Sequence, residues 1–206
     1  ANPGSLMLSA VMMLEHLGHA DAAAAIQKLA ALPDYAARFA TVFPGTEPAL
    51  GVANAAHALG AFVRQLHTRS RWDDFLDGDD RALTSQELIG VNTFINVGCT
   101  TCHQYRGLGG GMPQKLGLMQ PWTGKDRGRF EIDPTPGQEY FFKVTPLFDV
   151  ARTAPYYHDG SMGTLSEAVQ HMAQAQLNRK LTPAQVDAIV AFLGALNGGR
   201  PKILGD

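Results

Sequence analysis

Two cysteines and a histidine stand close together in this chain, in the run Cys99-Thr100-Thr101-Cys102-His103. They are the only cysteines among the 206 residues. Thiols at the two ends of such a turn can each form a thioether with one vinyl group of a haem, and the histidine that follows can present its imidazole to the iron. The spacing therefore predicts one covalently attached haem c, held by Cys99 and Cys102, with His103 as the proximal iron ligand.

An isolated dithiol, either a redox pair or half of a zinc site, is the alternative interpretation of the same residues. A structural zinc site needs further ligands at comparable spacing, and the sequence has no second cysteine pair. A thioredoxin-like pair belongs to a βαβ context, whereas the residues before Cys99 predict a helix. The motif and its placement therefore favour haem.

Composition limits the kinds of partner. Hydrophobic residues make up 45% of the chain and charged residues 17%, enough for one substantial core or two small ones. The formal net charge of -2 gives no basic surplus for nucleic acid, so we expect no nucleic-acid partner. No apolar stretch reaches the roughly 20 residues that a membrane-spanning helix needs, so we expect no membrane span.

The motif also bears on location. Covalent haem attachment is generally completed outside the cytoplasm, so we expect an exported, periplasmic protein. No signal-like start, with a positive charge, an apolar run and a cleavage site, stands in this sequence.

The residue pattern predicts an all-α fold, a cytochrome c-like helical haem domain with long loops. Apolar residues recur at helical spacing over residues 52–66, and shorter helical patterns cover residues 20–32 and 35–42. Residues 71–80 resemble a polar turn region, and the glycine- and proline-rich residues 107–137 a long loop. Capping boxes predict three further helix starts, at Thr84 with Glu87, Thr164 with Glu167, and Thr182 with Gln185. The first of these helices should run directly into Cys99.

The sixth iron ligand decides the chemistry of such a haem. A methionine sulfur closes the iron and raises its potential, whereas an open position permits peroxide binding. Of the seven methionines, Met7, Met12 and Met13 lie in an apolar run that predicts core packing. Four other methionines stay open as ligands on spacing alone: Met112, Met119, Met162 and Met172.

Longer motifs flank the cysteines on both sides. They comprise Phe43-Pro44-Gly45, Ser70-Arg71-Trp72-Asp73-Asp74-Phe75-Leu76-Asp77-Gly78-Asp79, Leu83-Thr84 with Glu87 and Gly90, Thr153-Ala154-Pro155-Tyr156-Tyr157-His158-Asp159-Gly160-Ser161, and Thr164-Leu165 with Glu167-Ala168-Val169 and Met172. On these residues the chain, from about Leu32 to Asn197, resembles the C-terminal, electron-transfer haem domain of the bacterial dihaem cytochrome c peroxidases and of the related enzyme that matures methylamine dehydrogenase.

That resemblance implies roles for particular positions. The C-terminal haem of the family is the high-potential, electron-accepting one, and its distal ligand corresponds to Met172, which leaves Met162 second. Family members bind calcium between their haems through backbone oxygens at the positions of Thr153 and Pro155, so the resemblance implies a calcium site there. His158 matches a histidine near the haem edge; on its own it is equally well explained as a turn residue bonded to its neighbours.

Departures from the family pattern shape the expected function. The family carries a second Cys-x-x-Cys-His motif in an N-terminal domain, and this sequence has one such motif. We therefore expect a monohaem carrier of single electrons with a six-coordinate His103/Met172 iron and no catalytic residue of its own. Its partner would be a redox protein: a donor or acceptor cytochrome, a cupredoxin or an enzyme. The alternatives are a peroxidase-like enzyme or subunit that reduces hydrogen peroxide, and an interaction subunit with a structural haem.

The start of the chain stands apart. Residues 1–19 look like a helix of the isocitrate and isopropylmalate dehydrogenases, although nothing else of a dehydrogenase follows. We accordingly divide the chain into an N-terminal helical segment of uncertain origin, residues 1–34, and the cytochrome c-like haem domain, residues 35–206.

Overall fold

The computed structural model describes residues 28, 31–46, 48–66, 68–201 and 203. It divides the chain into two compact units, and the cysteine–histidine motif lies in the unit Thr68–Arg200. The other unit contains helices α3 (Pro33–Val42) and α4 (Val52–Gln65), close to the ranges expected from the sequence. The expected helix over residues 20–32 lies almost wholly outside the described residues, and the boundary after residue 34 stays a prediction.

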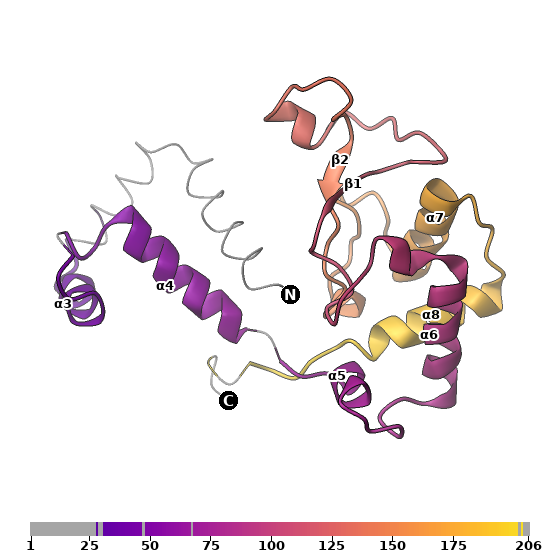
Figure 1. Ribbon diagram of the computed structural model, residues 1–206, viewed down its shortest axis with the longest axis horizontal. Coiled ribbons are helices and arrows are strands. Elements are labelled where there is room, and N and C mark those ends of the chain that lie inside the picture. Colours follow the sequence, from indigo (N-terminus) through magenta and orange to yellow (C-terminus); the bar gives the residue numbers. More distant parts are fainter. Residues whose placement is uncertain (1–27, 29–30, 47, 67, 202, 204–206) are drawn as a thin grey trace. The chain divides into compact units, whose positions relative to one another are not determined.

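The unit Thr68–Arg200 is mainly helical, with long connecting loops (Figure 1). Its elements are α5 (Arg71–Leu76), α6 (Ser85–Val97), η1 (Cys99–Thr101), β1 (Pro113–Lys115), η2 (Arg129–Glu131), β2 (Phe141–Lys143), η3 (Val150–Arg152), α7 (Leu165–Leu177) and α8 (Pro183–Gly194). The sheet in the described part of the chain is one short antiparallel pair, β1 with β2, in which Gln114 lies opposite Phe142. The all-α expectation is confirmed.

Capping boxes begin the helices of this unit. The three boxes expected from the sequence are present, and each threonine hydroxyl accepts a hydrogen bond from the backbone of the residue three positions on. A fourth box, Ser70 with Asp73, begins α5. The expectation of a polar turn region over residues 71–80 was therefore wrong for residues 71–76, because this box nucleates a short helix there.

The core forms where α6 and α8 cross (Figure 1). A Cβ on Gly90 of α6 would lie 2.0 Å from the Ala188 carbonyl oxygen and 2.7 Å from Phe192 Cβ, so the close crossing requires glycine. Phe192 packs edge-on against Trp72 of α5 and Phe94 of α6, with ring centroids 5.1 Å and 5.5 Å apart. The crossing therefore also fixes the end of α6, from which the haem motif continues.

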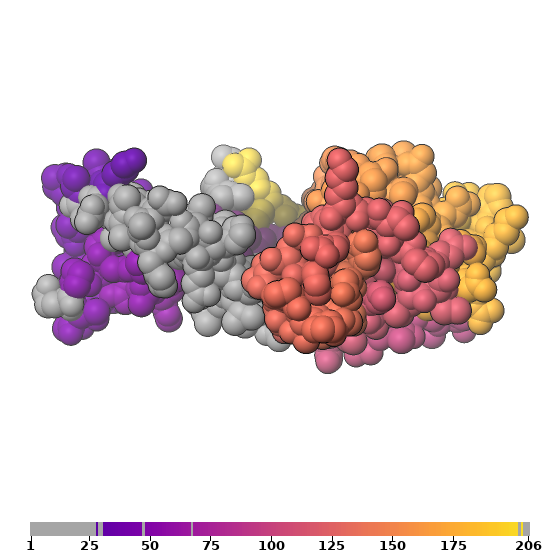
Figure 2. All heavy atoms as spheres, turned by 90° about the horizontal axis from the view of Figure 1, so that it is seen from above, coloured from indigo at the N-terminus to yellow at the C-terminus, as the bar shows by residue number. Residues whose placement is uncertain are grey.

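The long loop between η1 and α7 is tied down by backbone hydrogen bonds. Beyond the β1–β2 ladder, the Gly110 amide donates to Val144 and the Leu116 amide donates to Tyr140. In the space-filling view, the residues of this loop form most of the visible near face of their unit (Figure 2). No helix within the described ranges is long and apolar enough to cross a lipid bilayer.

Candidate haem site

The run from Cys99 to His103 follows directly after helix α6, at one end of the core. The helix ends at Gly98, whose φ of 103° lies in the left-handed region that glycine adopts without strain. Cys99–Thr101 then make one tight turn, and the Cys99 carbonyl oxygen accepts hydrogen bonds from the His103 amide at 3.0 Å and the Cys102 amide at 3.3 Å. The expected continuation of the helix into the motif is confirmed, and both thiols lie on a single rigid turn.

Both thiols are free and half-buried. Burial raises the pKa of the Cys99 thiol to about 11, and the neighbouring Cys102 adds to the shift. A dithiol redox site needs the opposite shift, because the reactive species is the thiolate. The environment of Cys99 therefore argues against a thioredoxin-like pair and leaves the thiol in the neutral form at pH 7.

His103 is oriented by a single backbone acceptor. Its Nδ1 lies 3.1 Å from the carbonyl oxygen of Leu108, and its ring lies 6.1 Å from that of Phe94, centroid to centroid. Burial lowers the pKa of His103, against the opposing effect of the Leu108 hydrogen bond. The imidazole is therefore neutral near pH 7, with Nδ1 engaged as a donor and the Nε2 lone pair left for a metal.

Leu108 is a site residue that the sequence did not reveal. Its contribution is a main-chain oxygen, and its φ of 48° places it in the left-handed region, which few residues other than glycine adopt. The glycine-rich residues 107–137 predicted a loop but not which carbonyl faces the histidine.

Met172 lies on α7, seven residues after Leu165 and three after Val169. Leu165, Val169 and Ala173 pack in the core cluster, whereas Met172 is half-buried and outside it. One turn further on, the Ala175 carbonyl oxygen accepts hydrogen bonds from the loop amides of Met119 and Gln120. The assignment of Met172 as the distal iron ligand stays a prediction.

The competing methionines are placed differently. Met112 and Met119 are 38% and 56% exposed in the loop that follows the motif. Met162 is half-buried, and its backbone pairs with Tyr156 through two hydrogen bonds across the turn that contains His158.

An aromatic cluster packs against α7 at His171. Trp122 stacks on Tyr157 with centroids 5.7 Å apart, and the Tyr157 hydroxyl lies 2.9 Å from Nδ1 of His171, the neighbour of Met172 in sequence. His158 stacks on Phe142 of β2 at 4.1 Å. Nothing in the sequence linked Trp122 to His171, and the position of His158 at the haem edge stays a prediction.

These residues fit a c-type haem. The donor set is two thiols on one turn and one neutral imidazole with Nε2 free, and a buried Trp122 Nε1 lacks a hydrogen-bond partner among the described residues. A haem carboxylate is an acceptor that such an N–H could use. In the described ranges, no group of three or more His, Cys, Asp or Glu side chains is placed to hold a metal ion.

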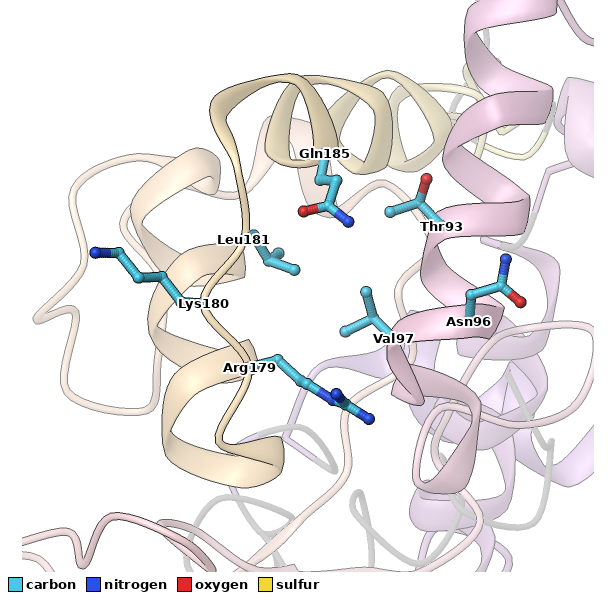
Figure 3. Close-up of a pocket in the computed structure, with 7 residues that line it drawn as sticks. All are labelled: Thr93, Asn96, Val97, Arg179, Lys180, Leu181 and Gln185. Atoms are coloured by element: carbon cyan, nitrogen blue, oxygen red, sulfur yellow. The ribbon is translucent and has the colours of Figure 1, made fainter.

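A surface hollow of about 320 Å³ lies close to the motif, and it has a different character (Figure 3). It is lined by Thr93, Asn96, Val97, Arg179, Lys180, Leu181 and Gln185. Arg179 extends toward Val97, whereas Lys180 points away. Its lining holds no thiol, imidazole or thioether, so it offers no iron ligand.

The residues expected to hold calcium are exposed. Thr153 and Pro155 lie between η3 and the His158 turn, and the Thr153 hydroxyl donates to the Val150 carbonyl oxygen at 3.1 Å. Their backbone oxygens as calcium ligands stay a prediction.

Comparisons with known proteins identify the family of the chain. A family model described as di-haem cytochrome c peroxidase matches residues 5–81, and a model described as cytochrome c matches residues 88–197. The first match includes most of residues 1–19, the stretch that also resembles a dehydrogenase helix.

Individual relatives carry related names. The chain is 38% identical to cytochrome c551 peroxidase of Pseudomonas aeruginosa over 183 residues, which cover 86% of this chain and 53% of that protein. It is 37% identical to cytochrome c551 peroxidase of Nitrosomonas europaea over 84% of this chain and 52% of that protein. The chain thus spans about half the length of these relatives.

A solved structure has a similar fold. It is described as a MauG-like protein associated with microbial copper homeostasis, and it matches with a TM-score of 0.71 at 25% identity. The match covers 87% of this chain and 63% of that protein.

Proposed function

Because the chain belongs to the cytochrome c family, whose domain carries a covalent haem c, we propose that it binds one haem and carries single electrons. Cys99 and Cys102 attach the haem, His103 is the proximal ligand and Met172 is the distal ligand. When bound, the haem supplies an iron centre that exchanges one electron.

One observation carries the proposal most directly: His103 Nδ1 is bonded to the Leu108 carbonyl oxygen. This bond fixes the tautomer and the ring plane, and it leaves Nε2 as the metal-binding atom. A ligand held in one orientation favours electron transfer, because little rearrangement then accompanies a change of iron charge.

Met172 supports the same role from α7. A thioether ligand raises the reduction potential and occupies the position that peroxide would need. Two anchors fix this helix near Met172: the Tyr157–His171 hydrogen bond and the loop amides that donate to Ala175. The absence of Met172 from the core cluster leaves its sulfur available for iron.

Peroxide reduction is the second candidate function. It is favoured by the 38% identity to a protein named as a peroxidase. For this chain to act so, its iron would have to be open or Met172 would have to leave on reduction. The two functions therefore differ in the state of one ligand.

The experiment is a spectrum followed by mixing with peroxide. An electron carrier shows a low-spin oxidised spectrum with the far-red sulfur-to-iron charge-transfer band and no rapid reaction with hydrogen peroxide. A high-spin oxidised spectrum and rapid oxidation by peroxide would establish the enzyme instead.

The setting of this function follows from the same chemistry. We infer a periplasmic location, and a partner that is a cytochrome, a cupredoxin or a redox enzyme. Calcium at the backbone oxygens of Thr153 and Pro155 belongs to the proposal as well. Titration with calcium followed by calorimetry tests it, with magnesium as the control ion.

A further inference from the structure

The turn that follows His103 is strained. Tyr105 and Leu108 have φ values of 66° and 48°, a region that costs free energy for any residue with a side chain. The Gly109 amide closes the turn on the Gln104 carbonyl oxygen at 2.7 Å. Such conformations persist only where the surrounding structure holds them. The residues that hold this turn therefore also hold the Leu108 carbonyl oxygen next to His103 Nδ1.

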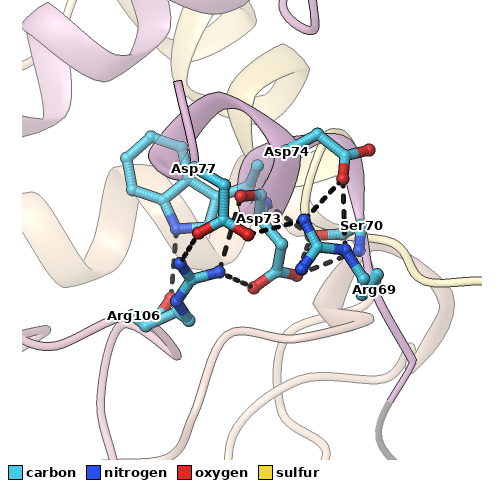
Figure 4. Close-up of polar contacts among 7 residues, drawn as sticks. Arg69, Ser70, Asp73, Asp74, Asp77 and Arg106 are labelled. Atoms are coloured by element: carbon cyan, nitrogen blue, oxygen red, sulfur yellow. Dashed lines mark hydrogen bonds and ion pairs between the residues drawn. The ribbon is translucent and has the colours of Figure 1, made fainter. Parts of the chain in front are cut away.

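Helix α5 binds this turn at Arg106, which lies between the two strained residues (Figure 4). The Trp72 indole Nε1 donates to the Arg106 carbonyl oxygen at 3.0 Å, and the Arg106 guanidinium donates to Asp73 Oδ1 at 3.0 Å and to Asp77. Backbone and side chain of one residue are thus both fixed to the same helix.

The carboxylate of Asp73, which binds Arg106, is held in one position. Its side chain is 2% exposed, and Oδ2 accepts from the Ser70 amide at 2.9 Å and the Ser70 hydroxyl at 2.8 Å. A buried carboxylate held in this way has one orientation, so Arg106 meets a fixed acceptor. Trp72 and Leu108 also lie in the same core cluster, which joins α5 to the acceptor of the histidine hydrogen bond.

We infer that Trp72, Asp73 and Arg106 are positioning residues for the proximal ligand: they hold the turn so that the Leu108 carbonyl oxygen accepts from His103 Nδ1. The inference rests on the proposed haem ligation by His103. A hydrogen bond from Nδ1 makes the imidazole a stronger donor to iron, which favours the oxidised state. Removing the contacts of Trp72 or Asp73 with Arg106 therefore raises the reduction potential without removing any iron ligand.

The test compares two arginines that both bind α5. Arg69 donates to Asp74 at 2.8 Å and to Asp77 at 2.7 Å, but its bonds stay within the residues around α5, whereas Arg106 belongs to the histidine turn (Figure 4). The variants are Arg106→Gln, the matched control Arg69→Gln, and Trp72→Phe, which removes the indole donor and keeps an aromatic ring. Haem content, midpoint potential and the paramagnetic NMR shifts of the haem methyl groups are measured on each holoprotein.

Arg106→Gln and Trp72→Phe should keep covalent haem and raise the potential, so that the reduced-to-oxidised ratio at a fixed electrode potential rises several-fold. Their haem methyl shifts should also move, while Arg69→Gln matches the unsubstituted protein and Arg106→Lys recovers part of the change. Equal effects of Arg69→Gln and Arg106→Gln, or no effect of either Arg106→Gln or Trp72→Phe, would overturn the inference. An unsubstituted protein without covalent haem would overturn the proposed function, and this inference with it.

Discussion

The Nδ1 atom of His103 lies 3.1 Å from the carbonyl oxygen of Leu108, five residues further along the chain. The contact links the imidazole to a turn that α5 contacts through Arg106, so in the proposed site a helix far from the motif in sequence positions the iron ligand. Helix α7 carries Met172, the proposed distal ligand. The proposed ligands His103 and Met172 and the crossing of α6 with α8 each lead to a measurable consequence.

Replacing Met172 by alanine should open the iron. Loss of the thioether removes the far-red charge-transfer band, lowers the reduction potential and lets exogenous ligands and peroxide bind. Visible spectra and peroxide mixing measure these changes. Met162→Ala is the matched control, since Met162 is also half-buried, and it should leave the band in place. If the band survived in Met172→Ala and vanished in Met162→Ala, the distal ligand would be Met162.

Replacing both Cys99 and Cys102 by alanine should abolish covalent attachment. The haem is then extracted by acidified organic solvent, and the intact mass falls to that of the bare chain. Each single variant should retain haem through one thioether, because the two thiols react with separate vinyl groups. Covalent haem in the double variant would contradict the assignment.

Gly90→Ala should destabilise the chain strongly. The added Cβ would meet the Ala188 carbonyl oxygen at 2.0 Å, and forced overpacking of this kind costs about 2–3 kcal/mol of unfolding free energy. Gly194→Ala in α8 is the control, because its Cβ would meet nothing within 4 Å and should change stability by less than about 1 kcal/mol. Denaturant unfolding measures both, and equal stabilities would show that α6 and α8 do not cross so closely.

Acid should weaken the fold partly through Glu87. Hydrogen bonding from Arg71 lowers the pKa of this nearly buried carboxyl in the folded chain. Its contribution is therefore complete above its ordinary pKa and is lost as the pH falls through the lowered folded value. Glu87→Gln should be less stable than the unsubstituted chain at pH 7 and should lose less stability over that acidic range.

Glu167 supplies the control for this experiment. It fills the same capping-box position in α7 but is exposed and lacks an arginine partner among the described residues. Glu167→Gln should change the acid dependence less than Glu87→Gln does. Equal slopes for the two variants would contradict the role of Arg71.

Short sequence patterns predicted much of the fold. A capping box depends on two residues three positions apart, so the starts of α6, α7 and α8 could be predicted. The same spacing at Ser70 and Asp73 was present in the sequence. Helix α5 was missed because it is six residues long, too short for apolar periodicity to register.

The site was only partly predictable for a related reason. Cys99, Cys102 and His103 are neighbours whose spacing is itself the chemical requirement. The Leu108 acceptor is a main-chain atom, and Asp73 and Arg106 are 33 residues apart, so only the folded chain brings them together. The link between Trp122 and His171 is likewise a product of tertiary packing.

The visible spectrum of the purified protein, oxidised and then reduced, tests the central claim most directly. A six-coordinate His103/Met172 haem c predicts a low-spin spectrum, the far-red band in the oxidised form, and a reduced pyridine complex typical of two thioether links. A spectrum without haem, or a high-spin oxidised iron that lacks the far-red band, would contradict it.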